Sequence, residues 1–530
     1  MIAETTSRRA LRRLALLLGT AVAVALFAPA GAAAAPMNGC TGVPTSDPDV
    51  TEYTCYWKAP GVLGYEVKQN TTFNIPEPIG VDGHITHMEV DLVDQSFAPV
   101  PISRLMLHHI VFLNASKFSD ATCGGYAGFG EEQLVPPGIG APERFYAAGE
   151  ERAKVTFPQG YGYEIKPGHD WAMVYMFMNH RKEADSNAWV EYKLTIDDSG
   201  TMKSARPYWL DVNNCRADPI YSVPGMHPRA RKRLSNKRVF RTLPRRVRKR
   251  LLARRTHTRS ADFTVHEAGW IVGGAGHVHG GAKRLTITKP SCGNRLVAQS
   301  VPRWGLPTHP FYNVRPILHE PGPIGMSAFR TREGIPVVGG QTLRLNSIYD
   351  NLRPHTRVMG IFVVYIAEER PDPPGAGSPQ ECGGPPGDIA YVPGTGEAGR
   401  SGPVRFTVPL TGIDAAGNAI KIKGPPGAFK RLGRRGRVEV GDRFFSKPNV
   451  VVRRGGRLRY DFNGAELHNL TLANGPLGIG SPNLDKARTF TQRFRRAGIY
   501  RFFCGLHPVQ MTQRVIVKKP PRRGARRRRR

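Results

Sequence analysis

The sequence predicts an all-β protein. Short runs rich in β-branched and aromatic residues recur along the chain, and Gly and Pro (59 and 45 of 530 residues) separate them. Apolar residues at helical spacing are nearly absent, and the one helical candidate is a basic stretch, 243–255, which could as well be disordered. The chain is too long for a single core, so we expect about three domains.

The expected strands are short and punctuated by turns. The clearest are residues 105–113, 171–179, 188–196, 285–288, 342–348 and 360–367. Pro/Gly-rich runs at 371–377 and 383–387 predict a linker, and a second loose segment covers 412–436. The expected layout is a targeting segment (1–35), a first β region (36–205), a basic insert (206–260), a second β region (261–370), a linker (371–437), a C-terminal β domain (438–517) and a basic tail (518–530).

The first 35 residues are typical of an export signal. A charged run from Ser7 to Arg13 precedes an apolar run from Leu14 to Phe27 and a small-residue stretch from Ala32 to Ala35. Ser-Arg-Arg-x-Leu also fits the twin-arginine route, and the ordinary secretory route fits equally well. No later segment has 18 consecutive apolar residues, so we expect no transmembrane span after signal removal. The mature protein is predicted to be periplasmic, cell-surface or secreted.

The net charge of +34 is concentrated in two places. Fourteen Lys or Arg and no acid lie between Arg229 and Arg255, and nine more lie between Lys518 and Arg530. Such blocks are usually solvated and mobile. The functional interpretation is adhesion of the tail to an anionic cell-surface polymer or membrane. The export signal and the lack of interleaved aromatic residues argue against a nucleic-acid partner.

The segment from Phe503 to Met511 supplies Cys504, His507 and Met511, and His468 lies upstream in a strand-like stretch. Two imidazoles, a thiolate and a weak axial thioether form the ligand set of blue-copper sites. The alternative is a buried free Cys beside ordinary histidines. Residues 438–517 resemble the cupredoxin family (plastocyanin, amicyanin, azurin). The resemblance implies a Greek-key β-sandwich that holds a type 1 copper through these four residues and transfers electrons.

Seven cysteines are present, at positions 40, 55, 123, 215, 292, 382 and 504. If Cys504 holds copper, six remain, an even number suited to disulfides in an oxidising compartment. Six cysteines allow fifteen connectivities, and the pair Cys40–Cys55 is the most plausible short loop.

A second set of metal-ligand residues lies in the long β region. In chain order they are His108, His109, His180, His277, His279 and Met359. His277 and His279 are two residues apart, so on a strand both side chains project from one face. The adjacent His108 and His109 point to opposite faces of a regular strand, so a shared ion requires a local distortion.

This order resembles the copper type II ascorbate-dependent monooxygenases, the peptidylglycine hydroxylase and dopamine β-hydroxylase family. The resemblance implies two jelly-roll β-sandwiches with one copper each and open solvent between them. His108, His109 and His180 would hold an electron-transfer copper, and His277, His279 and Met359 the oxygen-activating, catalytic copper. Segments 83–109 and 276–281 also resemble a plant stress-induced nodulin-related family.

Three positions depart from the peptide-hydroxylating members. Ala275 stands where those members carry a substrate-binding Arg, and Ile361 and Val363 stand where they carry Asn and Tyr. A glycine-extended peptide is therefore not the expected substrate. We expect no metal role for the other histidines, namely His84, His87, His169, His227, His257, His266, His309, His319 and His355.

The preferred hypothesis joins the two copper regions. The cupredoxin would pass electrons from an ascorbate-like reductant or a redox protein to the monooxygenase-like region for hydroxylation. The alternative is a non-enzymatic extracytoplasmic protein for copper binding and electron transfer. A third hypothesis is a structural surface protein with vestigial sites.

Overall fold

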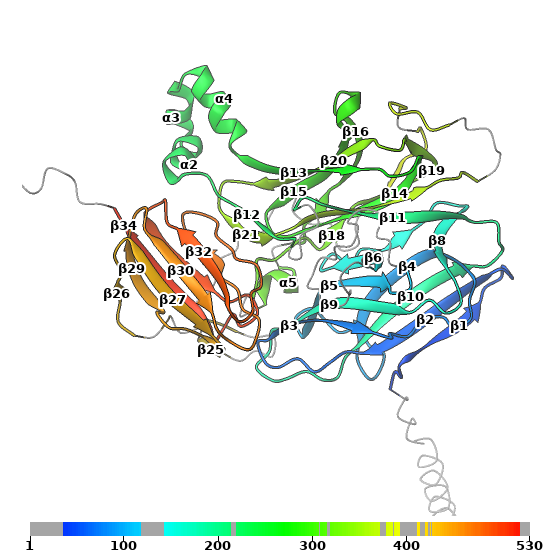
Figure 1. Ribbon diagram of the computed structural model, residues 1–530, viewed down its shortest axis with the longest axis horizontal. Helices are drawn as coiled ribbons and strands as arrows, with labels where there is room; N and C mark the ends of the chain where they lie inside the picture. The colour runs from blue at the N-terminus through cyan, green and yellow to red at the C-terminus, as the bar shows by residue number, and fades with distance from the viewer. Residues whose placement is uncertain are drawn as a thin grey trace, which may run out of the picture.

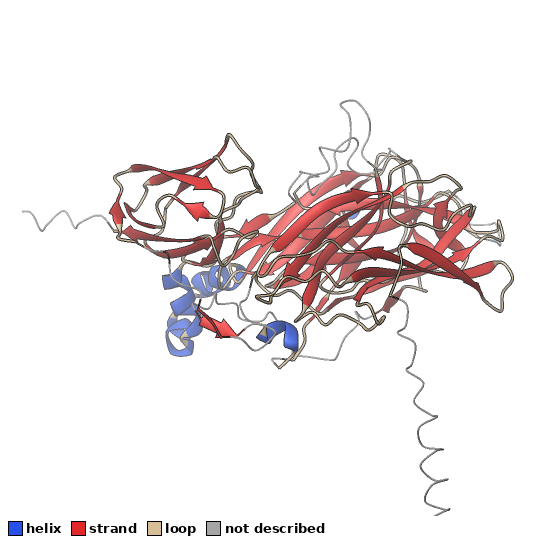
Figure 2. Cartoon of the chain, turned by 90° about the horizontal axis from the view of Figure 1, so that it is seen from below, coloured by secondary structure: helices blue, strands red, loops and turns tan. Residues whose placement is uncertain are grey.

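The computed structural model describes residues 35–117, 142–213, 219–306, 308–314, 318–371, 378–384, 386–392, 411–413, 419–421, 425 and 427–519. Strands dominate these residues, as the sequence predicts, and they form three β-sandwiches, which can be followed in Figures 1 and 2. The predicted signal segment up to residue 34, Cys123, Cys215 and the tail beyond residue 519 lie outside the described residues. Among the described residues, none of the helices combines the length and apolar character needed to span a membrane.

The first sandwich packs two sheets around one apolar core that both of them line. One sheet has the order β3 (Val67–Phe73), β9 (Trp171–Asn179), β5 (Leu105–Asn114) and β6 (Glu143–Gly149). The other contains β1 (Gly39–Pro44), β2 (Val50–Lys58), β10 (Trp189–Asp197), β4 (Gly83–Val93), β8 (Tyr161–Ile165) and the short β7 (Val155–Thr156) paired to β4. β5 and β9 are buried along their whole length, which explains their nearly continuous apolar sequence.

The second sandwich continues the larger sheet of the first. Beyond β8 the sheet runs through β11 (Lys203–Asp211), β22 (Gly360–Ala367), β14 (Gly269–Val278), β19 (Ala328–Val337) and β23 (Ala390–Val392). The facing sheet has the order β13 (Thr256–Thr264), β20 (Thr342–Asp350), β15 (Ala282–Lys289) and β16 (Arg295–Ser300). Two short pairs complete it: β12 (Tyr221–Val223) with β21 (His355–Val358), and β17 (Pro302–Arg303) with β18 (Gly325–Met326).

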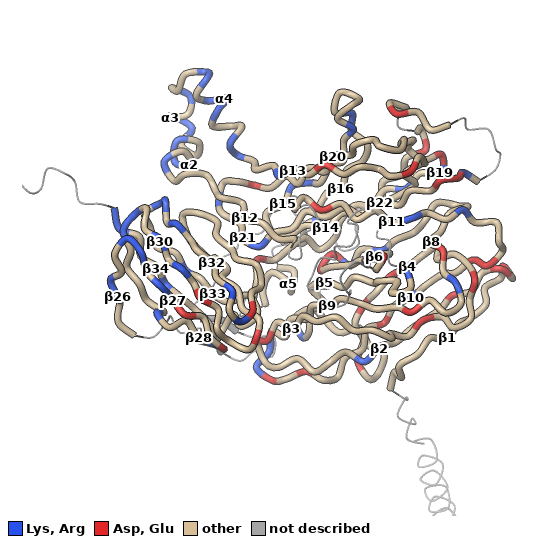
Figure 3. Tube along the Cα trace, viewed as in Figure 1, with Lys and Arg blue, Asp and Glu red and all other residues tan. Residues whose placement is uncertain are grey.

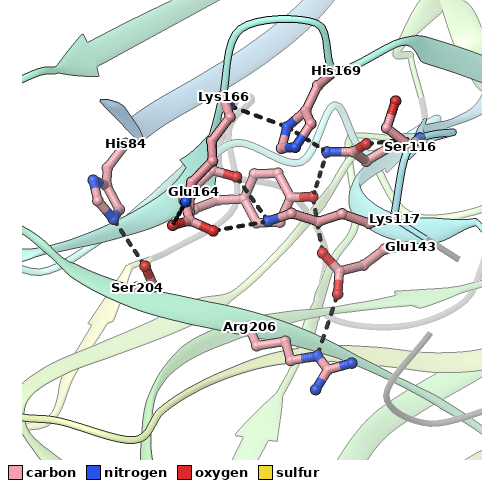
Figure 4. Close-up of polar contacts among 11 residues, drawn as sticks. His84, Ser116, Lys117, Glu143, Glu164, Lys166, His169, Ser204 and Arg206 are labelled. Atoms are coloured by element: carbon pink, nitrogen blue, oxygen red, sulfur yellow. Dashed lines mark hydrogen bonds and ion pairs between the residues drawn. The ribbon is translucent and has the colours of Figure 1, made fainter. Parts of the chain in front are cut away.

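Parallel pairing of β8 with β11 joins the two sandwiches. Lys203 pairs with Tyr161 and Ser204 with Gly162. A polar network covers this junction (Figure 4), in which the buried Glu143 accepts from Tyr163 Oη at 2.9 Å and pairs with Arg206 at 3.3 Å. The sandwiches are therefore fixed against each other, which determines how their facing histidines meet.

The C-terminal domain is a third sandwich that follows the linker. Its five-stranded sheet has the order β26 (Lys430–Arg431), β29 (Asn449–Arg453), β34 (Thr512–Lys518), β33 (Gly498–Phe503) and β31 (Thr471–Asn474). The four-stranded sheet has the order β28 (Phe444–Phe445), β27 (Arg435–Gly441), β30 (Arg457–Phe462) and β32 (Arg488–Arg493). The pairings β27–β30 and β29–β34 are parallel, so they need crossover connections rather than hairpins.

This domain is docked on both N-terminal sandwiches (Figure 1), and Arg357 of β21 donates to Asn483 Oδ1 at 3.0 Å. Val67 N–H of β3 donates to Leu506 O at 3.4 Å. Met106, Met176 and Met178 of the first sandwich belong to the same apolar cluster as the core of the C-terminal domain. The contact therefore involves the loop that carries Cys504.

The basic insert contains three short helices instead of the single expected one. They are α2 (Pro228–Ser235), α3 (Lys237–Thr242) and α4 (Arg245–Ala253). The Asn236 side chain accepts from Val239 N–H and so begins α3, and Pro244 precedes α4. Within the range 206–260, β11, β12 and part of β13 lie on either side of these helices. Figure 3 shows Lys and Arg along all three.

The linker range is tied to the second sandwich. Cys382 forms a disulfide with Cys292, and β23 pairs with β19. A small hairpin, β24 (Thr411–Ile413) with β25 (Ala419–Lys421), lies further on. Another short helix, α5 (Pro310–Asn313), lies in the second half of the chain. The expected disulfide Cys40–Cys55 is confirmed. Cys504 is free and buried.

Candidate metal sites

The loop after β33 carries three of the four predicted blue-copper ligands. Cys504 follows the end of β33, and its N–H donates to Met511 O at 3.0 Å. Met511 N–H donates in turn to His507 O, also at 3.0 Å. These bonds fold the loop back on itself, so that Cys504, His507 and Met511 come from one end of the domain.

His468 reaches the same end from the segment before β31. Two backbone hydrogen bonds with Leu484, at 3.0 and 2.8 Å, fix its position. His468 Nδ1 lies 3.9 Å and His507 Nδ1 3.8 Å from Cys504 Sγ. Metal bonds to nitrogen and sulfur measure ~2.0–2.3 Å, so one ion can bridge atoms at these separations.

Each imidazole of this pair is held from behind by a carboxylate. His468 Nε2 lies 3.0 Å from Asp442 Oδ1, and His507 Nε2 lies 3.1 Å from Glu466 Oε2. A protonated Nε2 that donates to a carboxylate leaves the Nδ1 lone pair directed at Sγ, as in the outer shell of many metal sites. The Asn469 N–H donates to Cys504 Sγ at 3.4 Å, which stabilises charge on the sulfur.

Burial affects the protonation of Cys504 and His507. Cys504, His468 and Met511 are completely buried. Burial raises the pKa of the Cys504 thiol, so a thiolate here needs a cation beside it. Burial, and then the neighbouring His468, lower the pKa of His507, which favours the neutral imidazole that a metal requires. The hydrogen bond from His468 lowers the pKa of Asp442 to about 2.

A β-bulge places His108 and His109 together. Leu107 of β5 pairs with Phe177 of β9, but the next pair is His109 with Met176, so His108 is an extra residue. The two Nδ1 atoms lie 3.0 Å apart. This bulge is the local distortion that the sequence required if the adjacent imidazoles were to face the same space.

His277 and His279 lie together at the end of β14, with ring centroids 5.2 Å apart. His277 Nδ1 lies 3.0 Å from Glu151 Oε1, and His279 Nδ1 donates to Arg357 O at 2.9 Å. Among the described residues, the buried Nε2 atoms of both have no hydrogen-bond partner. An imidazole that is held through Nδ1 and whose Nε2 has no hydrogen-bond partner is typical of a metal ligand. Met359, the third predicted member, is also buried.

The two predicted copper groups are neighbours rather than separated by open solvent. The His279 ring lies 5.3 Å from the His108 ring, edge to face. Close approach is possible because Gly149, at the end of β6, has no side chain: a Cβ there would lie 2.7 Å from His277 Cε1. The monooxygenase resemblance implies open solvent between the two groups, so the close approach differs from that expectation. The groups meet because the pairing of β8 with β11 joins the two sandwiches.

His180 is buried just after β9 and is not one of the residues that line the cavities beside the other histidines. Two residues without a predicted role join His108 instead. Glu150 Oε1 lies 3.2 Å from His108 Nε2, and His319 Nε2 also contacts Glu150 Oε1. Sequence reasoning gave His319 no metal role, and the only available signal was its residue type.

Three further histidines make polar contacts near the core. His355 Nδ1 lies 2.8 Å from Glu320 Oε1, and its buried Nε2 has no hydrogen-bond partner among the described residues. At the junction of the sandwiches (Figure 4), His84 Nε2 lies 2.9 Å from Ser204 Oγ, and Asn114 contacts His169 Nδ1 at 3.1 Å.

A cavity of about 90 Å³ separates the histidine cluster from the C-terminal domain. His108, His109, His279, His319 and Met359 are among its lining residues on one side. Phe503 and Gly505, the two neighbours of Cys504, line it as well. The candidate blue-copper loop and the histidine cluster therefore line the same cavity.

A second cavity, of about 50 Å³, lies between the two sandwiches. His109 and His277 line it, with Glu151 and a largely apolar remainder. Ala275, Ile361 and Val363, the three positions that depart from the peptide hydroxylases, also line it. Its wall therefore favours an apolar occupant.

Comparison with known proteins gives matches among solved structures. A purple cupredoxin from Nitrosopumilus maritimus is 20% identical over 16% of this chain and 99% of its own length, with a TM-score of 0.15. A reduced amicyanin variant is 27% identical over 16% of this chain and 80% of its own, and a Cu(I) form of another amicyanin variant is 25% identical over 16% and 82%. Both have TM-scores of 0.15. No protein-family model and no curated protein matches the chain.

Proposed function

We propose that this protein is an exported copper protein whose C-terminal domain transfers electrons. The observation that carries the proposal is the convergence of His468 Nδ1 and His507 Nδ1 on the buried Cys504 Sγ, at 3.9 and 3.8 Å. Thiolate and imidazole donors with a weak thioether suit copper in both oxidation states. The Cys40–Cys55 and Cys292–Cys382 disulfides support an oxidising, extracytoplasmic location.

Copper held by these residues supplies one-electron redox chemistry. The protein's part is to fix the two imidazoles through Asp442 and Glu466 and to exclude water from Cys504. A site that is rigid in this way changes little in geometry between oxidation states, which favours rapid electron transfer.

The electron acceptor proposed within the chain is the histidine cluster. Phe503 and Gly505, the neighbours of Cys504, line the same cavity as His108 and His319, so the route would pass through these two residues. The external donor is an ascorbate-like reductant or a redox protein. His507 is only partly buried, which leaves one edge of the site accessible to it.

The test is the copper content and visible spectrum of the full-length protein. The wild type should bind copper at Cys504 and show an intense thiolate-to-copper band. Cys504→Ser should abolish the band, because an alcohol cannot replace the soft thiolate. Cys292→Ser, which changes a disulfide cysteine away from the site, is the matched control and should retain the band. A colourless wild type that binds no copper would contradict the proposal.

A monooxygenase-like activity is the second candidate. It is supported by the buried Nε2 atoms of His277 and His279, which have no hydrogen-bond partner among the described residues, and by the apolar cavity beside His277. In this proposal His277, His279 and Met359 would hold a copper, which would supply oxygen activation. Ascorbate-supported oxygen consumption that disappears in Met359→Ala supports the enzyme. Copper binding without oxygen consumption across a broad substrate panel favours electron transfer alone.

A further inference from the structure

We infer that His108, Glu150 and His319 form a transition-metal site that bridges the two N-terminal sandwiches, separate from the Cys504 site. The three ligand atoms all lie within 4.8 Å of one another. The sequence grouped His108 with His109 and His180, so this site uses a different pair of partners.

The ligands come from different parts of the fold. His108 is the bulged residue of β5, and Glu150 follows β6, the neighbouring strand of the same sheet. His319 comes from the segment between α5 and β18 in the second half of the chain. A bound ion would therefore connect the two sandwiches as well as occupy the cluster.

The separation of His108 from Glu150 suits a shared ion. His108 Nε2 lies 3.2 Å from Glu150 Oε1, and two ligands bonded at ~2.0–2.2 Å to one tetrahedral ion lie about this far apart. His319 Nε2 contacts the same Oε1 atom. Gly322 N–H donates to Glu150 Oε2 at 2.9 Å, which fixes the carboxylate and keeps Oε1 directed at the two imidazoles.

A fourth donor, His279, is close by, and here it would serve the bridging ion rather than an ion shared with His277 and Met359. The His279 ring lies 5.3 Å from that of His108, and both line the cavity of about 90 Å³. His279 Nδ1 donates to a carbonyl, so Nε2 carries the lone pair, and this atom is buried without a partner among the described residues. Imidazole and carboxylate donors of this kind take Cu(II) or Zn(II), with Cu(II) held more tightly.

The experiment titrates metal-free, full-length Cys504→Ser protein with Cu(II) or Zn(II) and measures bound ions per chain. Glu150→Gln keeps an acceptor for Gly322 N–H but loses the negative charge, and His319→Ala removes one imidazole. Each substitution should weaken the binding of one ion by more than about 100-fold, because even the loss of an outer-shell partner lowers metal affinity by about 10–100-fold. The Cu(II) electron paramagnetic resonance signal of that ion should lose nitrogen coupling in His319→Ala.

Two controls make the result decisive. Asp185→Asn changes a buried carboxylate of the first sandwich that pairs with Arg104 and Arg181, and it should leave metal binding unchanged. The same substitutions made with Cys504 intact should retain the visible copper band, which shows that the chain is folded. Parental metal affinity in both Glu150→Gln and His319→Ala would overturn the inference. So would loss of the ion in His180→Ala with full binding in Glu150→Gln.

Discussion

His277 of the second sandwich lies directly against Gly149 of the first. A Cβ on Gly149 would come 2.7 Å from His277 Cε1, 2.8 Å from Nδ1 and 2.5 Å from Glu151 Oε2. The missing side chain lets two histidine groups that are far apart in sequence meet across the interface. His277 Nδ1 also lies 3.0 Å from Glu151 Oε1, and this contact holds the His277 ring in place.

Gly149→Ala should therefore separate the two histidine groups. We expect a loss of about 1–3 kcal/mol in unfolding free energy, because the extra methyl group enters a packed interface. Metal affinity at the cluster should fall as well. Gly61→Ala is the matched control, since a Cβ there would meet its nearest neighbour at 3.7 Å. Denaturant unfolding and metal titration measure both effects, and equal behaviour of the two variants would contradict the proposed role of Gly149.

Much of the fold could be predicted because local pattern determines it. The apolar runs of β5, β9 and β22 are buried on both faces, and their sequences show it without any tertiary information. The Cys504 loop was equally accessible, because three of its ligands lie within eight residues. The need for a distortion at His108 also followed from strand geometry, and the bulge supplies it.

The rest depends on contacts that no local pattern encodes. Glu150 and His319 are 169 residues apart, and they meet only because β8 and β11 join two sandwiches into one sheet. The resemblance to two separate copper domains favoured an open space between the histidine groups. Of the three helices of the basic insert, α3 begins at the Asn236 cap and α2 at the His227 side chain, whereas α4 has no side-chain cap, and such caps are weak signals in a strongly basic stretch.

Met511→Leu should keep copper at the C-terminal site but raise its reduction potential. The thioether is the weak axial ligand of the predicted set, and an axial ligand of this kind tunes the potential. Met511 is completely buried, so Leu can fill much of the same space. Redox titration of the visible band measures the shift, with Met37→Leu, an exposed methionine, as the control. An unchanged potential would remove Met511 from the ligand set.

The basic tail is predicted to hold the protein on anionic surfaces. Truncation after Val517 should release it from anionic vesicles at moderate salt, while electron transfer in solution stays unchanged. A second variant, with Gln in place of the exposed Arg245, Arg246 and Arg250 of α4, separates the contribution of the helices from that of the tail. Equal retention of the truncated and full-length proteins at every ionic strength would refute adhesion by the tail.

Asp442→Asn should weaken copper binding at the C-terminal site by about 10–100-fold, the usual cost of losing an outer-shell partner of a ligating imidazole. Asp442 contacts His468 Nε2 and also accepts the N–H groups of Ala465 and Glu466. Asp485→Asn changes an exposed carboxylate of the same domain, paired with Arg488, and should have no effect. Copper competition with a chelator measures both, and equal affinities would show that Asp442 does not support His468.

The metal-free protein should lose stability as the pH falls below about 6.5. Burial lowers the pKa of His109 to about 3, and burial also lowers the pKa values of His108 and His279. Between pH 6.5 and 3 the unfolded chain therefore binds a proton at His109 that the folded chain does not, so the unfolding free energy rises with pH across this window. Each such group contributes a slope of at most about 1.4 kcal/mol per pH unit.

His109→Gln tests this relationship directly, because Gln retains polarity without titrating. The slope of unfolding free energy against pH should decrease by about one group's contribution below pH 6.5, while the curves of the variant and parent should run parallel above pH 7.5. Saturation with Cu(II) should shift the loss of stability in the parent to lower pH, because an ion at the cluster binds only the neutral imidazoles. Identical slopes in the two metal-free proteins would mean that His109 is not held neutral by the fold.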